Sequence, residues 1–238
     1  MIDISFFVPC LNEESNVINT INTILLSIKR YNLKYEILVI DDNSSDNTLQ
    51  VVEDYKNQNP DINLVLIQND ITKGVGTTYI DTAFVATGKY YMLVNGDNVE
   101  PEETLVLILD QIGKADIIIP YFGNEDNRKF FRIVLSKMFT KLVNFFNGYN
   151  IPYYNGPVLH LRYNVMRWSP DTHGYAYQAE LISRILQEGF NFKGIQIKNN
   201  DRVTGQSSAF TVKNIFAVVH SLLQIFLRRL RILLFYRK

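Results

Sequence analysis

Short apolar runs alternate with helical stretches through the first half of the chain, and this alternation is the strongest constraint on its fold. The apolar runs hold Val, Ile and Leu without a clean every-second-residue pattern, as in strands buried on both faces. Such alternation predicts an α/β fold with a mostly parallel sheet flanked by helices. The predicted strands are Ile4–Val8, Glu36–Ile40, Asn63–Ile67, Tyr90–Val94 and Asp116–Pro120, and the predicted helices are Glu14–Arg30, Asp46–Asn57, Gly76–Ala86 and Pro101–Ile112.

The second half is less regular. It ends in an amphipathic helix that is apolar at first and basic at its end. No internal repeat, low-complexity tract or linker divides the chain, so we expect one domain over residues 1–238. The predicted strands here are Val158–Tyr163 and Phe192–Ile197, and the predicted helices are Arg128–Asn147, Tyr175–Gln187 and Val212–Tyr236.

Polar loops follow the first four predicted strands. In parallel sheets of this kind, ligands bind beyond the carboxyl ends of the strands. The rule selects four loops, which are Pro9–Glu14, Asp41–Thr48, Gln68–Gly76 and Asn95–Glu100. Chance is a poor explanation for four successive loops with groups that suit a nucleotide, so we expect a shared ligand site.

The first three loops carry groups that can bind a nucleotide. Asn12 and Glu13 follow Pro9 and offer hydrogen-bonding groups, or simply cap the next helix. The adjacent carboxylates of Asp41 and Asp42 can accept hydrogen bonds from a base and a ribose, or stay solvated. In the third loop, a lysine beside a glycine can reach a phosphate, a weak signal by itself because no Walker pattern is present. These two residues are Lys73 and Gly74.

The fourth loop, Asn95-Gly96-Asp97-Asn98, carries the candidate metal ligands. Hard cations such as Mg²⁺ or Mn²⁺ take oxygen ligands and complete their shell with substrate phosphates. Asp97 offers a carboxylate and Asn95 a neutral oxygen. The alternative is a turn rich in Asn and Asp with no ligand.

Composition narrows the class of protein. The 238 residues are 47% apolar, enough for one core, and 24 basic residues balance 24 acidic ones, so nothing favours nucleic acid. The single Cys10 suits a reducing cytosol. The amino-terminal stretch lacks the basic region of a signal peptide, and no apolar run reaches the roughly 18 to 20 residues of a membrane span. We therefore expect a cytoplasmic protein.

Two segments interleave bulky apolar residues with Arg and Lys, residues 128–146 and 212–238. Such segments suit peripheral contact with the inner face of an anionic membrane. The alternative is two helices packed on the core with their basic residues in water. We favour membrane contact because aromatic residues are abundant and the carboxyl terminus is basic.

The chain resembles family 2 glycosyltransferases, which have the nucleotide-sugar-binding GT-A fold. The resemblance rests on P-C-L-N-E-E at 9–14, V-I-D-D-N-S-S-D-N-T at 39–48, K-G-V-G at 73–76 and A-T-G-K-Y-Y-M-L-V-N-G-D-N at 86–98. The stretch R-V-T-G-Q-S-S at 202–208 is similar to an element of the polyprenyl-phosphate (dolichol-phosphate mannose) branch. The resemblance implies a nucleotide-sugar half over residues 1–120, an acceptor half over 121–210 and a helix over 211–238.

The resemblance also implies roles for individual residues. Asp97 matches the second acid of the D-x-D motif and binds the metal, with Gly96 and Asn95 beside it. Lys73 and Gly74 lie near the base and phosphates. The nucleoside is held by Pro9, Glu13 and Asp42, the late element that closes over the diphosphate contains Arg202 and Ser207, and the acidic residue of the helix after the acceptor loop is Glu180.

Three positions depart from the family pattern. The first acid of D-x-D is Asn95, the lysine expected after the late serine is Ser208, and residues 151–155 lack an expected aspartate. These departures bear on metal affinity, on clamping of the diphosphate and on the acceptor.

The implied activity is inverting transfer of a sugar from a nucleotide-diphosphate sugar, assisted by Mg²⁺ or Mn²⁺. We expect Asp97, Glu180 and Arg202 to be catalytic. The acceptor is a lipid phosphate or a saccharide, and a saccharide requires a general base, for which only Glu180 and Asp171 are candidates. The implied pathway is cell-envelope glycan synthesis. The alternative is an impaired GT-A domain that serves as a nucleotide-sugar-binding or partner module.

Overall fold

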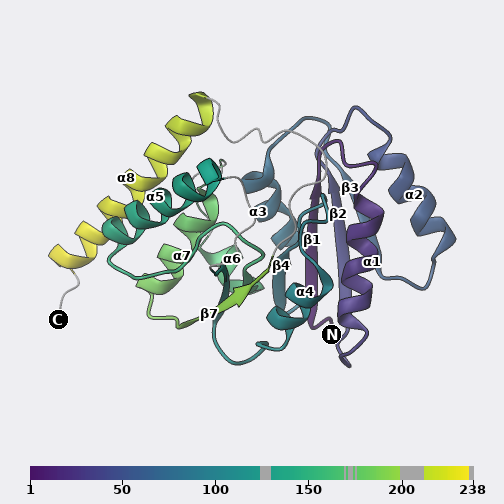
Figure 1. The fold of residues 1–238 in the computed structure, drawn as a ribbon, viewed down its shortest axis with the longest axis horizontal. Coiled ribbons are helices and arrows are strands. Elements are labelled where there is room, and N and C mark those ends of the chain that lie inside the picture. The colour runs from purple at the N-terminus through teal and green to yellow at the C-terminus, as the bar shows by residue number, and fades with distance from the viewer. Residues whose placement is uncertain (124–129, 169, 171–173, 175, 199–211, 236–238) are drawn as a thin grey trace.

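The computed structural model describes residues 1–123, 130–168, 170, 174, 176–198 and 212–235. In these ranges, seven strands form one sheet with helices on both faces (Figure 1). The strands are β1 Ile4–Cys10, β2 Tyr35–Asp41, β3 Leu64–Gln68, β4 Tyr90–Leu93, β5 Ile117–Phe122, β6 Leu159–Leu161 and β7 Phe192–Ile197. The helices are α1 Val17–Ile28, α2 Thr48–Gln58, α3 Val75–Val85, α4 Glu102–Leu109, α5 Phe130–Asn147, α6 Arg162–Arg167, α7 Tyr177–Gln187 and α8 Val212–Phe235.

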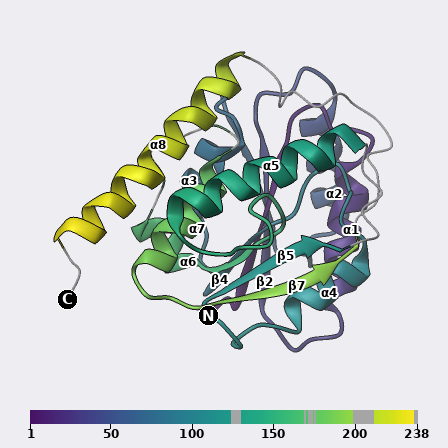
Figure 2. The ribbon, with the colours of Figure 1, turned by 60° about the vertical axis from the view of Figure 1, so that its left-hand side comes forward.

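The strand order is β3-β2-β1-β4-β6-β5-β7. The first four strands are parallel to one another, as the sequence predicts. β6 runs antiparallel to both of its neighbours, β4 and β5. β7 is parallel to β5, and the two strands lie side by side in Figure 2. Because β1 to β4 share one direction, the loops that follow them all leave the same edge of the sheet.

Both faces of the sheet are buried, as the apolar composition of the strands predicts. On one face, alternate residues of β1 such as Ile4, Phe6 and Val8 pack with α1, α2 and α4. On the other face, Phe7 packs in a cluster that includes Tyr79 of α3 and residues of α6 and α7. An apolar layer therefore packs on each face of the sheet and fixes the position of its loop-bearing edge.

Several boundaries differ from the sequence prediction by a few residues, and two of the differences have a cause that the contacts show. α1 begins at Val17 rather than Glu14, because the backbone N–H groups of Glu13 and Glu14 donate to side chains of Thr48 and Asp46. The predicted strand Val158–Tyr163 is shorter, and its end is the start of α6. There Arg162 donates to the carbonyl oxygens of Gly88 and Ala83, contacts between distant segments that no local pattern reveals.

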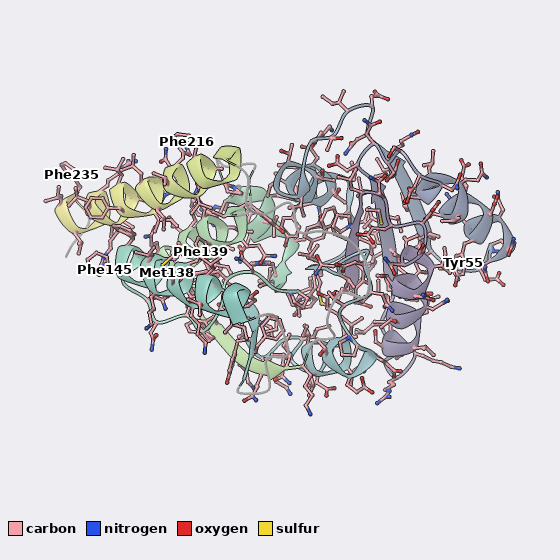
Figure 3. All side chains as sticks on the ribbon, turned by 45° about the horizontal axis from the view of Figure 1, so that its top comes forward. Tyr55, Met138, Phe139, Phe145, Phe216 and Phe235 are labelled. Carbon is pink, nitrogen blue, oxygen red and sulfur yellow. The ribbon has the colours of Figure 1, made fainter. Side chains whose placement is uncertain are left out.

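Helices α5 and α8 lie side by side away from the loop-bearing edge of the sheet (Figures 1 and 2). The rings of Phe146 and Phe226 stack edge to face with centroids 5.7 Å apart, and Arg229 Nη1 donates to the carbonyl of Phe145 at 2.7 Å. Phe216 and Phe235, near opposite ends of α8, are both exposed (Figure 3). Among the described residues, every helix is too short or too polar to cross a membrane.

Candidate functional site

The loops after β1 and β2 are joined through Asn12. Its φ of 59° lies in the left-handed region, which asparagine tolerates better than most residues. Its N–H donates to Ser44 Oγ at 2.9 Å, and its Oδ1 accepts the N–H of Ser45 at 2.8 Å. Beside it, the buried carboxylate of Glu13 accepts from Asn16 Nδ2. Asn12 therefore couples two loops rather than capping its own helix.

Asp42 joins the loop after β2 to the loop after β3. Its side chain is buried, and its N–H donates to the carbonyl of Cys10 at 2.8 Å. Its carboxylate accepts the N–H groups of Lys73 at 2.9 Å and Gly74 at 2.8 Å, and Asn69 Nδ2 at 2.8 Å. Gly74 has a φ of 84°, which glycine adopts without strain. The third loop is thus wrapped around a buried carboxylate that is saturated by charge-assisted hydrogen bonds.

Other predicted residues of these loops take different positions. Lys73 Nζ pairs with Asp81 Oδ2 of α3 at 3.0 Å, so its ammonium lies beside that helix. Asp41 is buried at the end of β2, where its carboxylate accepts long hydrogen bonds from the Ser44 N–H, at 3.3 and 3.4 Å. Among the carboxylates of the second loop, Asp41 therefore keeps more accepting capacity than Asp42.

The loop after β4 is pressed against β1 and α1. A Cβ at Gly96 would lie 2.7 Å from the Pro9 carbonyl oxygen and 2.8 Å from Cys10 Sγ, so only glycine fits. Thr20 Oγ1 of α1 lies 3.2 Å from the Asn95 carbonyl oxygen and 3.0 Å from that of Gly96, where it donates. Thr23 Oγ1 donates to Asn98 Oδ1 at 3.0 Å. Neither threonine was predicted from the sequence, because nothing local links them to a loop about 75 residues away.

The same loop closes on its own buried glutamate, Glu100. Its Oε2 accepts the backbone N–H of Asn95 at 3.1 Å, and its Oε1 accepts Asn95 Nδ2 at 2.6 Å. Burial, and secondarily the charge of Asp97, raise the pKa of Glu100 to about 8, while the hydrogen bonds from Asn95 oppose the shift. No role was predicted for Glu100 from the sequence. The sequence does hold one signal for this contact, which is a glutamate five residues after an asparagine in the same short loop.

The oxygen donors of this loop fit a hard cation that also binds phosphate. Because Asn95 Nδ2 is committed to Glu100, Oδ1 is the atom that this amide can offer, and the half-buried Asp97 adds a carboxylate in the same turn. Across the described ranges, no group of three or more His, Cys, Asp or Glu side chains could hold a metal. Magnesium sites commonly use one or two carboxylates plus substrate phosphates. The donors are therefore those of a site that a nucleotide diphosphate completes.

The remaining candidates lie elsewhere. Glu180 is buried in α7, where its Oε1 pairs with Arg184 Nη2 at 2.7 Å and lies 4.0 Å from Arg228 Nη2 of α8. Asp171 and the late element with Arg202, Ser207 and Ser208 lie outside the described residues. The structure thus brings the four strand-end loops together and puts Glu180 into an arginine pair.

Solved structures share this architecture. Mannosyl-3-phosphoglycerate synthase from Rubrobacter xylanophilus superposes with a TM-score of 0.70 at 18% identity, over 97% of this chain and 74% of that one. A mannosyltransferase from Pyrobaculum calidifontis, in complex with GDP-Man and Mn²⁺, gives a TM-score of 0.67 at 18% identity, over 96% of this chain and 64% of that one. At these identities the likeness shows the fold, which is GT-A.

Sequence comparisons identify the family. A poly-β-1,6-N-acetyl-D-glucosamine synthase from Staphylococcus epidermidis is 28% identical over 124 residues, which are 51% of this chain and 28% of the synthase. The chain thus matches well under half the length of that relative. The model of glycosyl transferase family 2 matches residues 5–171, most of the chain. Together with the four joined loops at one edge of a GT-A sheet, this match shows that the chain belongs to glycosyl transferase family 2.

Proposed function

We propose that this protein is an inverting glycosyltransferase that moves a sugar from a nucleotide-diphosphate sugar to an acceptor with the help of a divalent cation. The observation that carries the proposal is the loop after β4, where Asp97 and Asn95 present oxygen donors beside three other strand-end loops. Family membership supports the same chemistry.

Each loop has a distinct task in this proposal. Asp97 and the Asn95 Oδ1 hold Mg²⁺ or Mn²⁺. When bound, the cation neutralises charge that develops on the leaving diphosphate. We assign recognition of the nucleoside to Glu13 and Asp41, whose carboxylates are buried in the first and second of these loops. Asp42 holds the Lys73–Gly74 backbone in place, so that its own contribution to donor binding is indirect.

A lipid phosphate is the acceptor class that we favour. A sugar hydroxyl needs a general base within hydrogen-bond reach, whereas a phosphate oxygen is already an anion. Glu180 is in an ion pair with Arg184, which supports an acceptor that needs no base. The name of the Staphylococcus epidermidis relative supports the competing choice, a saccharide acceptor, and is consistent with cell-envelope glycan synthesis.

A lipid acceptor requires contact with a membrane, and helices α5 and α8 are suited to it. Exposed Val134, Met138 and Leu142 share a face of α5 with the exposed Lys137 and Lys141. α8 adds more exposed apolar side chains, with Phe216 and Phe235 near its two ends (Figure 3). The exposed apolar residues of α8 are Phe216, Val219, Leu223, Phe226, Leu227, Leu230, Leu233, Leu234 and Phe235. Apolar side chains beside basic ones favour the interface of an anionic membrane. We therefore propose peripheral attachment at the inner face of the cytoplasmic membrane.

Donor hydrolysis tests the activity. We expect the protein to hydrolyse or transfer from at least one member of a panel of UDP- and GDP-sugars in the presence of Mn²⁺. Asp97→Ala should lower the rate about a hundredfold or more, because a charged ligand of the transition-state cation is lost. The control is Asp61→Ala, an exposed carboxylate before β3 at the opposite end of the strands.

Two results would contradict the proposal. No turnover of any donor, combined with a rise in melting temperature when a nucleotide sugar is added, would favour a binding module without catalysis. Equal turnover by Asp97→Ala and wild type would place the metal elsewhere. Offering polyprenyl phosphate and oligosaccharide acceptors side by side then separates the two acceptor classes.

Sedimentation with lipid vesicles tests the membrane contact. We expect wild type to bind vesicles of phosphatidylglycerol more strongly than vesicles of phosphatidylcholine, and added salt to weaken that binding. A Phe216→Ser/Phe235→Ser variant should bind several-fold less, because each phenylalanine removes apolar area from water at the interface. Equal binding by this variant and wild type would contradict the contact.

A further inference from the structure

We propose that Glu100 is a positioning residue for the metal site, and that Asn95 is the partner this buried carboxyl requires rather than a lost acid of the D-x-D motif. The proposal rests on the proposed function, because it assigns a task within the same site. It also explains why the chain departs from the family pattern at position 95.

The geometry of the pair is bidentate. Glu100 accepts both the backbone N–H of Asn95, at 3.1 Å, and its Nδ2, at 2.6 Å. Both the backbone N–H and the side-chain Nδ2 of Asn95 therefore donate to the same carboxyl group. In the structure the nitrogen of the Asn95 amide is the atom that faces Glu100. Its oxygen is left to point elsewhere.

The fixed orientation has a consequence for metal binding. A cation needs the oxygen of the amide, and an Asn whose amide could turn over would present a donor nitrogen half of the time. Partners that orient a metal ligand commonly set metal affinity nearly as strongly as the ligand itself. Glu100, at 4% exposure, is held rigidly enough for such a task.

The surroundings of the pair support a task beyond folding. Thr20 donates to the carbonyl oxygens of Asn95 and Gly96, so that α1 also holds this turn. Gly96 presses the turn against Pro9 and Cys10. The backbone is thus secured from two other sides, and the distinct contribution of Glu100 is its contact with the Asn95 amide.

Single substitutions should disturb the pair in opposite ways. Asn95→Asp restores the family acid but replaces the amide nitrogen that donates to Glu100 Oε1 with a carboxylate oxygen, which cannot donate. In Glu100→Gln, the amide nitrogen of the introduced glutamine faces Asn95 Nδ2, and two donors then oppose each other. The clash is relieved if the Asn95 amide turns over, but its nitrogen then faces the cation. We expect each change to weaken Mn²⁺ binding about tenfold.

Exchanging the two groups should restore binding. In Asn95→Asp/Glu100→Gln, the side-chain oxygen of the introduced glutamine can accept the backbone N–H of residue 95. The nitrogen of the same amide can donate to the introduced aspartate, so both hydrogen bonds survive with one reversed. We expect Mn²⁺ affinity within about threefold of wild type, because no donor or acceptor is left unmatched. The non-additivity of the two changes measures their coupling.

The experiment measures Mn²⁺ binding by electron paramagnetic resonance, first with UDP and then with GDP present, for wild type and these three variants. Melting temperatures of the metal-free proteins report folding separately. Glu103→Gln is the matched control, because this exposed carboxylate begins the same helix, α4, and should keep wild-type affinity.

The outcomes separate this inference from the proposed function. If wild type does not bind Mn²⁺ in the presence of UDP or in the presence of GDP, the proposed function fails and the role of Glu100 fails with it. If wild type binds but Asn95→Asp binds equally or more tightly, or the exchange is no better than the sum of the single changes, only the role of Glu100 is overturned. Loss in both single variants with recovery in the exchange supports it.

Discussion

The two halves of the molecule differ in what they bury and what they expose. Up to residue 100, five carboxylates are buried and each accepts hydrogen bonds from within the fold; these are Glu13, Glu36, Asp41, Asp42 and Glu100. From residue 130 onward, α5 and α8 leave a row of large apolar side chains exposed. The first arrangement fixes loops by hydrogen bonds, whereas the second leaves an apolar surface exposed, which supports the membrane contact that we propose.

Asp42 is the strongest test of the fixed half. We expect Asp42→Asn to lower the free energy of unfolding by about 3 kcal/mol, because the amide nitrogen would face the N–H donor of either Lys73 or Gly74, whichever oxygen it replaces. Urea unfolding measures the change. Asp81→Asn is the control, since it removes only the half-exposed ion pair with Lys73 and should change stability by less than about 1 kcal/mol. Equal effects would mean that the loop is not held by Asp42.

His160 tests the strand that joins the two halves, β6. It is fully buried, neither ring nitrogen has a hydrogen-bond partner among the described residues, and burial lowers its pKa from 6.5 to about 3. As pH falls, His160 therefore takes up a proton in the unfolded chain before it does so in the folded chain. The contribution of the neutral, buried His160 to stability is complete above pH 6.5 and is lost as pH falls toward 3.

Replacing this histidine should flatten the pH dependence of stability. Between pH 6.5 and 4, we expect wild type to lose about 3 kcal/mol more than His160→Leu, as one proton is taken up preferentially by the unfolded state. Unfolding by urea at several pH values measures the difference. The exposed His220→Leu is the control, and a wild-type slope in His160→Leu would contradict the prediction.

Gly96 tests whether close packing of the fourth loop matters for the site. A Cβ there meets the Pro9 carbonyl, which is backbone and cannot turn aside. We expect Gly96→Ala to lower stability by about 2 kcal/mol and to weaken nucleotide-dependent Mn²⁺ binding, because the turn must move. Thermal unfolding and Mn²⁺ titration measure the two effects. Lower stability with unchanged Mn²⁺ binding would contradict the prediction, because it would show that close packing of this loop does not matter for metal binding.

The smallest effect is expected on the exposed half. Phe216→Ser/Phe235→Ser should change the free energy of unfolding by no more than about 0.5 kcal/mol, since exposed positions contribute little to folding. Urea unfolding without lipid measures it. Clear destabilisation would mean that these side chains pack within the chain, and the contrast between the halves would weaken.

Much of the fold before residue 120 could be predicted from sequence. Strand burial, helix positions and the polarity of strand-end loops are local patterns, so the alternation before residue 120 led directly to a parallel sheet with its loops at one edge. The second half was harder. The short strand β6 and helix α6 depend on contacts such as Arg162 with Gly88, which lies 74 residues away in the chain.

The fold class, the family motifs and the sheet edge that carries the polar strand-end loops follow from the sequence alone, because they depend on local periodicity and on the chemistry of each residue. The folded structure settles which contacts those residues make. It bound Asp42 to the third loop, paired Lys73 with Asp81, set Thr20 beneath the fourth loop and joined Asn95 to Glu100. Hydrogen bonds depend on distance and direction in space, and a motif records neither.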